Sequence, residues 1–211
     1  KDSFTYNVRD VNGITSNTAT VNINVNPVGS NDNVTTKLNT AVIIDVKNND
    51  ISKTGTLVNL KTLTIHGTLV VNVNNTVTYT PAAGYAGNDT YTYTLLTPDG
   101  LESDHITVSI FINNPPVAVT DNSITGINTP VITDVTANDT DIDGTISKST
   151  VAVITPPLHG TVVADPVTGK VTYTPATDYT GPDSYTYTVK DDKNDESNLA
   201  TVNLIVKIPP K

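Results

Sequence analysis

The chain has 211 residues, enough for two domains of ordinary size that each bury a core. It contains no Cys, Met or Trp and only two Phe against nine Tyr, and Thr, Val and Asn are abundant, which favours strands over helices. Without Cys, disulfides and thiol chemistry are excluded. A formal net charge of -9, with Arg9 as the only arginine, argues against nucleic acid and anionic membranes as partners.

The first segment, residues 1–30, is predicted to be a hairpin. Its two strands read "DSFTYNV" from Asp2 and "TATVNINV" from Thr18, and a similar pair of sequences closes each later unit of the chain. Two strands alone are marginally stable in water. We therefore expect the segment to be the last hairpin of a preceding repeat in a longer protein, with exposed edges that could pair with another chain.

The remainder is predicted to form two tandem repeats, residues 31–115 and 116–211. Matching segments recur at intervals of about 90 residues: "VTYTPAAGYAGND" at Val77 returns as "VTYTPATDYTGPD" at Val171. In the second repeat, alternating residues bounded by Gly, Pro, Asn and Asp predict short strands. Their number is typical of an immunoglobulin-like β-sandwich, so the chain is predicted to be all-β. The strands are expected near residues 117–125, 130–136, 150–155, 160–164, 169–174, 184–190 and 198–207.

Several of these motifs resemble a known class of repeat. "NDTDIDG" at Asn138, "YTGPDSYTYTV" at Tyr179 and "ATVNLIV" at Ala200 are similar to the bacterial cadherin-like and immunoglobulin-like repeats of giant surface adhesins, including those of biofilms and gliding motility. The resemblance covers essentially the whole chain. It implies a secreted, non-catalytic segment at the bacterial cell surface, in contact with neighbouring repeats of the same chain, with a glycan or protein ligand bound at a distant tip.

The stretch "NDTDIDGT", residues 138–145, places aspartates at every second position before a glycine. In a sandwich of this topology the loop lies at the same end as residues 190–196 and the linker 113–122. Calcium prefers six to eight oxygen ligands, which these carboxylates and amides could supply. Thr150 stands where an EF-hand needs its bidentate glutamate, so the loop is not an EF-hand. A solvated aspartate turn is the alternative interpretation.

The resemblance also implies a calcium ion between the linker, the acidic loop and the base of the preceding repeat. The ligands that it implies are Asp139, Asp141 and Asp143 in the loop, Asn114 and Asp121 in the linker, Asp191 and Asp192 in the neighbouring loop, and Asp89 at the base of the first repeat.

The first repeat departs from this acidic pattern. Its loop runs from "NND" directly to "ISKTG", so the equivalents of Asp141 and Asp143 are missing and Lys53 lies nearby. We therefore expect its own junction, near residues 26–33, to bind calcium poorly or not at all.

Enzymatic activity is not predicted. His66, His105 and His159 are scattered, and the common catalytic and phosphate-binding motifs are missing from the sequence. The sequence has no apolar run of about 20 residues, so no membrane insertion of this segment is predicted.

The leading hypothesis is an adhesin stalk, and the alternatives are repeats that bind a carbohydrate directly or an accessory module of a secreted hydrolase. The tyrosines recur at fixed repeat positions and are expected in the cores, with an exposed sugar-binding platform as the alternative.

Overall fold

The computed structural model describes residues 2–208, and every regular element in that range is a β-strand. The predicted all-β fold is therefore confirmed. The described residues include no helix long and apolar enough to cross a membrane. The short segments 35–40 and 83–87 belong to one compact unit with the residues from 111 onward.

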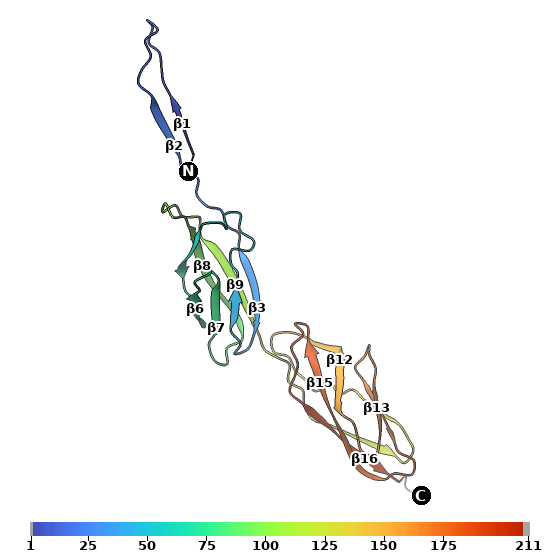
Figure 1. Cartoon of the computed structure of the whole chain (residues 1–211). Helices are drawn as coiled ribbons and strands as arrows, with labels where there is room; N and C mark the ends of the chain where they lie inside the picture. The colour runs from blue at the N-terminus through green and yellow to red at the C-terminus, as the bar shows by residue number, and fades with distance from the viewer. Residues whose placement is uncertain (1, 209–211) are drawn as a thin grey trace. The chain divides into compact units, whose positions relative to one another are not determined.

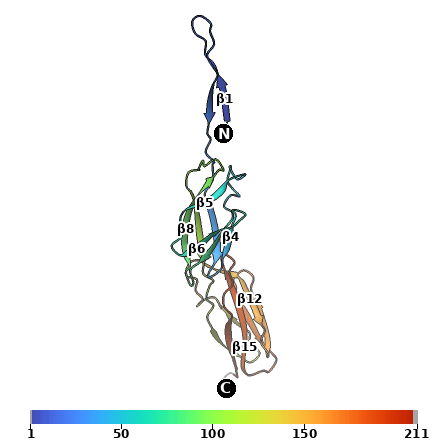
Figure 2. The same cartoon turned by 60° about the vertical axis from the view of Figure 1, so that its left-hand side comes forward.

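The second sandwich has two sheets, ordered β10-β16-β15-β12 and β11-β14-β13. β10 runs parallel to β16. β12 and β15, which lie side by side in Figure 2, are antiparallel neighbours. This is the predicted immunoglobulin-like arrangement. Its strands are β10 (Asp121–Gly126), β11 (Val131–Thr133), β12 (Ile146–Thr155), β13 (Gly160–Ala164), β14 (Val171–Pro175), β15 (Gly181–Asp191) and β16 (Ala200–Lys207).

Four strand ends in this sandwich differ from the sequence prediction by three or four residues. β11 ends at Thr133 and not at 136, and β15 begins at Gly181 and not at 184. β10 begins at Asp121 and not at 117, because Val117 makes only an isolated bridge to Thr140 before the chain reaches the sheet. β12 begins at Ile146 and not at 150, and a register shift between Ser147 and Ala152 interrupts its pairing with β15. Alternation of residue types does not reveal such a bulge, since the extra residues break the period of two.

The first sandwich has the same two-sheet order, β3-β9-β8-β5 and β4-β7-β6 (Figure 1). The cores of both sandwiches contain six of the eight recurring tyrosines, because alternate strand residues point inward. The other two, Tyr85 and Tyr179, precede β8 and β15 and are only half-buried. The buried tyrosines are Tyr79, Tyr91, Tyr93, Tyr173, Tyr185 and Tyr187. The strands are β3 (Asp32–Lys37), β4 (Val42–Ile44), β5 (Leu57–Thr62), β6 (Gly67–Val71), β7 (Val77–Pro81), β8 (Gly87–Leu96) and β9 (Ile106–Asn113).

The N-terminal segment forms the predicted hairpin. β1 (Asp2–Tyr6) and β2 (Ala19–Ile23) pair antiparallel as a two-stranded sheet. Side chains on both strands stay exposed, including those of Phe4, Tyr6 and Ile23.

Glycine at the start of β13 is required by the tyrosine beneath it. A Cβ added to Gly160 would lie 2.5 Å from Tyr173 Cε2 and 2.6 Å from the Thr174 carbonyl oxygen. Gly160→Ala is therefore expected to lower the free energy of unfolding by about 1–3 kcal/mol, as overpacking does. Chemical denaturation measures this. The control is Gly126→Ala, where the nearest atom to the new Cβ is Thr129 Oγ1 at 3.4 Å; equal stability of the two variants would contradict the prediction.

Candidate functional site

The linker, the acidic loop and the β15–β16 loop meet at one end of the second sandwich. Val117 N donates to Thr140 O at 2.7 Å, and Thr140 N returns a bond to Val117 O at 3.0 Å. Asp192 N donates to Thr145 O at 2.9 Å. The predicted convergence of these three segments is therefore present, and backbone hydrogen bonds join the acidic loop to both of the others.

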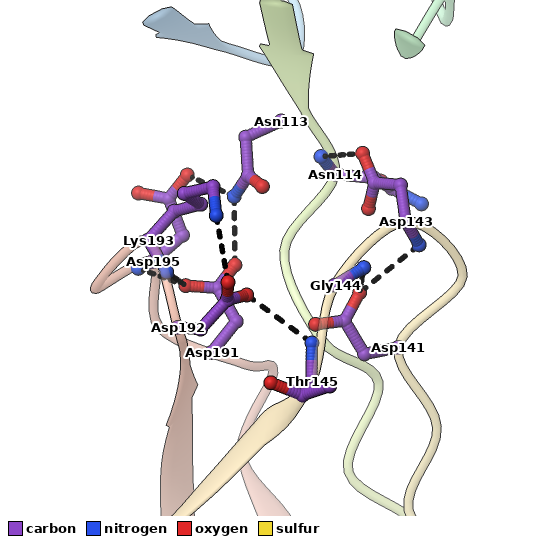
Figure 3. A network of polar contacts seen from close by, with 10 residues as sticks. All are labelled: Asn113, Asn114, Asp141, Asp143, Gly144, Thr145, Asp191, Asp192, Lys193 and Asp195. Carbon is purple, nitrogen blue, oxygen red and sulfur yellow. Dashed lines mark hydrogen bonds and ion pairs between the residues drawn. The ribbon is translucent and has the colours of Figure 1, made fainter.

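The acidic loop folds back on its own backbone and holds the linker (Figure 3). Asp141 Oδ1 accepts bonds from Asp143 N at 3.3 Å and Gly144 N at 3.1 Å, and Asp143 Oδ2 accepts a bond from Asn114 N at 3.0 Å. The other oxygens of these two carboxylates, Asp141 Oδ2 and Asp143 Oδ1, are buried without a hydrogen-bond donor among the described residues. Buried acceptors are normally paired, so this end of the sandwich lacks donors.

Gly144 leaves space between two carboxylates. A Cβ at this position would lie 2.6 Å from Asp192 Oδ1 and 2.7 Å from Asp141 Oδ2. Carboxylates from the two loops therefore flank the same backbone atom, and any larger residue would push them apart. The predicted ligands Asp141 and Asp192 are thus neighbours in space.

The second loop is organised by Asp191. Its Oδ1 accepts bonds from Lys193 N at 2.9 Å and Asp195 N at 2.7 Å. Asn113 Nδ2 lies 2.7 Å from both Asp191 Oδ2 and Asp195 Oδ2 (Figure 3). Asn113 Oδ1 is buried without a donor among the described residues. The sequence prediction included Asp191 but missed Asn113 and Asp195, whose only signal was their place within the linker and the loop.

Negative charge exceeds positive charge at this end. Lys193 pairs with Asp192 at 2.6 Å, and Lys37 pairs with Asp195. The hydrogen bond from Lys193 lowers the pKa of Asp192. Burial raises the pKa of Asp141, and the nearby charges of Asp143 and Asp191 raise it further. The two ammonium groups therefore do not neutralise the cluster of carboxylates.

Asp139 and Asp121 surround the hydroxyl of a core tyrosine. Tyr187 OH lies 2.9 Å from Asp139 Oδ1, 2.7 Å from Val135 O and 3.4 Å from Asp121 Oδ2. Asp139 Oδ1 also accepts a bond from Val119 N, while its Oδ2 is buried without a donor within residues 2–208. Burial, followed by the charge of Asp139, raises the pKa of Asp121 to about 6. These two predicted ligands form a carboxylate pair fixed to the core.

Asp89 anchors a turn within the first sandwich. Its carboxylate accepts bonds from the backbone of Ile65, His66 and Thr90 and from Tyr79 OH. Asp183 has the equivalent set of donors in the second sandwich. The prediction that Asp89 is a metal ligand therefore gains no support from the structure.

The carboxylates do not form a complete metal centre. Within residues 2–208, no group of three or more His, Cys, Asp or Glu side chains lies close enough to hold a metal ion. The unpaired atoms at this end are all carboxylate or amide oxygens, which suit a hard cation such as calcium better than a transition metal. The oxygen atoms at this end are of the kind that binds calcium. To complete a coordination sphere around one ion, the acidic loop and the β15–β16 loop would have to move closer to each other.

In the first sandwich, lysines occupy the equivalent loop. Lys47 Nζ donates to Lys53 O at 3.0 Å and Thr56 O at 2.7 Å. Lys53 Nζ donates to Asn48 O at 2.6 Å. The ammonium groups of Lys47 and Lys53 therefore donate to the backbone carbonyl oxygens of this shorter loop. The second sandwich has Thr136 in place of Lys47 and so lacks this donor.

Topology and core define the class of both repeats as immunoglobulin-like β-sandwich domains. The chain belongs to the bacterial Ig domain family, whose model matches residues 24–111 and 113–205. The prediction of bacterial immunoglobulin-like repeats is therefore confirmed. Among the curated proteins compared with the chain, none matches.

Solved structures similar to the chain come from several sources. A three-domain immunoglobulin fragment of titin is 10% identical with a TM-score of 0.45, over 89% of this chain and 68% of that one. The CbhA fibronectin(III)-like modules of Clostridium thermocellum are 19% identical with a TM-score of 0.35, over 86% and 92%. An endo-fucoidan hydrolase of glycoside hydrolase family 107 is 14% identical with a TM-score of 0.34; the match covers 99% of this chain but 34% of the hydrolase.

Proposed function

We propose that the chain is a non-catalytic stalk segment of a bacterial cell-surface adhesin, in which calcium fixes the linker to the second repeat. The observation that carries the calcium proposal is the set of buried, donor-free oxygens at the end where the linker enters that repeat. They belong to Asn113, Asp139, Asp141 and Asp143. Tandem sandwiches of the bacterial Ig family suit a stalk because each sandwich is a stiff body whose two sheets share one core.

The ion would be held by residues on three segments. Asp141 and Asp143 would supply carboxylate oxygens from the acidic loop, Asp192 from the β15–β16 loop, and Asn113 an amide oxygen from the linker. A bound calcium ion supplies positive charge that the cluster lacks, which removes the repulsion among the carboxylates. Because the linker would be bound to both loops, its backbone would lose freedom and the junction would stiffen.

An extracellular location suits this kind of site. Extracellular calcium modules bind the ion with Kd values of about 0.1–1 mM, which suits the calcium concentration outside cells. The first sandwich, whose loop is held by Lys47 and Lys53, would need no ion. We therefore propose that the linker before the second repeat responds to calcium and the linker before the first does not.

The test is thermal unfolding with calcium and with a chelator. An ion that binds only the folded state at about ten times its Kd adds about 1.4 kcal/mol, which raises Tm by roughly 5–10 °C for a domain of this size. The double variant Asp141→Asn with Asp143→Asn should lose this rise. The control is Asp104→Asn, an exposed position on the first sandwich, which should keep it.

Superimposed curves in calcium and chelator would refute the calcium site and make the loop a solvated turn. The alternative, direct carbohydrate binding, would have to use the tyrosines outside the cores, since only Tyr85 and Tyr179 among the recurring ones are half-buried and Tyr6 of the hairpin is exposed.

A further inference from the structure

The N-terminal hairpin repeats the last hairpin of the second sandwich residue for residue. Phe4 pairs with Val21 and Tyr6 with Ala19 in the β1–β2 ladder. The β15–β16 ladder has the same register. It runs from Asp183 paired with Leu204 to Tyr187 paired with Ala200, just as β1–β2 runs from Asp2 paired with Ile23 to Tyr6 paired with Ala19.

The loop of the hairpin is also folded as it is in the complete repeat. Asp10 Oδ1 accepts bonds from Asn12 N and Ile14 N, just as Asp191 Oδ1 accepts bonds from residues 193 and 195. Val8 N donates to Ser16 Oγ at 3.1 Å, and Val189 N donates to Ser197 Oγ at 3.1 Å. The hairpin therefore already has the conformation of a closing hairpin.

Burial is what separates the two hairpins. Tyr185 and Tyr187 are 1% and 0% exposed, whereas the equivalent Phe4 and Tyr6 are 53% and 49% exposed. Val8, Ile23 and Val25 are exposed too, although their equivalents Val189, Leu204 and Val206 are buried. Covering these side chains would remove apolar surface from water, which favours docking. The hairpin thus presents the inner face of a sandwich without the opposite sheet.

Both edges of the hairpin are unpaired as well. In the second sandwich, β16 pairs in parallel with β10 along Asp121–Gly126, and β15 pairs antiparallel with β12. Within residues 2–208, β1 and β2 pair only with each other. Unpaired edges beside an exposed apolar face make a docking surface with a defined geometry.

We propose that residues 2–25 are a docking element that completes an immunoglobulin sandwich, and that the occupant of its face is the other five strands of a bacterial Ig repeat, equivalent to β10–β14. The chain itself contains this interface, between β15–β16 and the rest of the second sandwich, and the hairpin reproduces one side of it in register. A second hairpin of the same kind would offer no parallel edge strand for β2 and only two strands to cover the face, so it fits less well.

A hairpin exchange within the full chain tests this inference. Residues 183–206 are replaced by residues 2–25, so that the same sequence stands at both ends of one molecule. If the inference is right, the second sandwich still folds, and NMR shows the transplanted amides exchanging at least about a hundredfold more slowly than the same amides in the N-terminal copy. Adding Val21→Asp to the transplanted copy should abolish that protection, because a charge would enter the core.

A second chimaera separates the face from the loop. It transplants only residues 2–6 and 19–25 and keeps the native residues 188–199. If the second sandwich fails to fold in both chimaeras, the hairpin does not complete a sandwich of this family and the inference is overturned. A dimer of the unmodified chain that Val21→Asp in the N-terminal hairpin dissociates, seen by light scattering, would assign the face to a second copy and overturn the proposed occupant. A monomer at all concentrations, with a folded chimaera, supports it.

Discussion

Tyr93→Phe is expected to lower the free energy of unfolding of the first sandwich by about 2 kcal/mol, while Tyr91→Phe leaves it unchanged or raises it slightly. Both side chains are fully buried on β8. Tyr93 OH lies 2.5 Å from Val46 O and 3.0 Å from Asp50 Oδ2. Tyr91 OH has no hydrogen-bond partner within residues 2–208. The same atom is removed in both variants, but only one removal breaks bonds.

The loss of stability expected for Tyr93→Phe is large because the variant leaves buried acceptor groups without a donor. Asp50 is 2% exposed, so its carboxylate would lose a donor that water cannot readily replace. Burial and the charges of Asp32 and Asp50 raise the pKa of Tyr93, so the hydroxyl remains a donor at all ordinary pH values. Urea denaturation followed on amide signals of the first sandwich measures both variants. Equal losses for the two would show that the hydroxyl bonds contribute nothing and that only packing matters.

Local patterns were enough to predict most of the fold. Strict alternation in segments such as "SYTYTV", residues 184–189, places Tyr185 and Tyr187 on one face, and the structure buries both. The departures occur where the pattern is interrupted: the bulge in β12 and the bridge at Val117 depend on pairing with distant segments. Residue types along one strand carry no signal for such pairing.

The candidate site could be predicted only in part for the same reason. Asp141 and Asp143 stand out because their spacing is local. Asn113 contacts Asp191 and Asp195 across separations of 78 and 82 residues, which no single-sequence pattern reveals. Asp139 belongs to the same acidic run, yet it points to Tyr187 in the core. Position in a run therefore identifies acidic residues without showing which of them face the same space.

Each sandwich is expected to lose stability as pH rises from about 4 to about 6. Burial, followed by the charge of Asp50, raises the pKa of Asp32 to about 6, and Asp121 beside Asp139 behaves in the same way. Between the unfolded pKa near 4 and the folded value, the folded chain holds more protons, so stability falls as pH increases. Two pKa units correspond to about 3 kcal/mol, but both groups are partly solvated, and about 1 kcal/mol for each is expected.

The measurement is denaturation at several pH values in chelator, with Asp32→Asn and Asp121→Asn as reciprocal controls. Asp32→Asn should flatten the profile of the first sandwich and leave that of the second unchanged, and Asp121→Asn should do the reverse. Stability that rises from pH 4 to pH 6 in both sandwiches would show that these carboxylates are stabilised as anions, contrary to the burial and repulsion in the structure.

Repeating the profile in calcium separates the predicted ligands from one another. A bound cation favours the charged form of a carboxylate and therefore lowers its pKa. If Asp121 is a ligand, the fall in stability of the second sandwich should move to lower pH in calcium and disappear from the range between 4 and 6. If only the Asp141 and Asp143 side of the cluster holds the ion, that fall should stay in place while overall stability rises. In either case the first sandwich, whose loop is satisfied by lysines, should give the same profile with and without calcium.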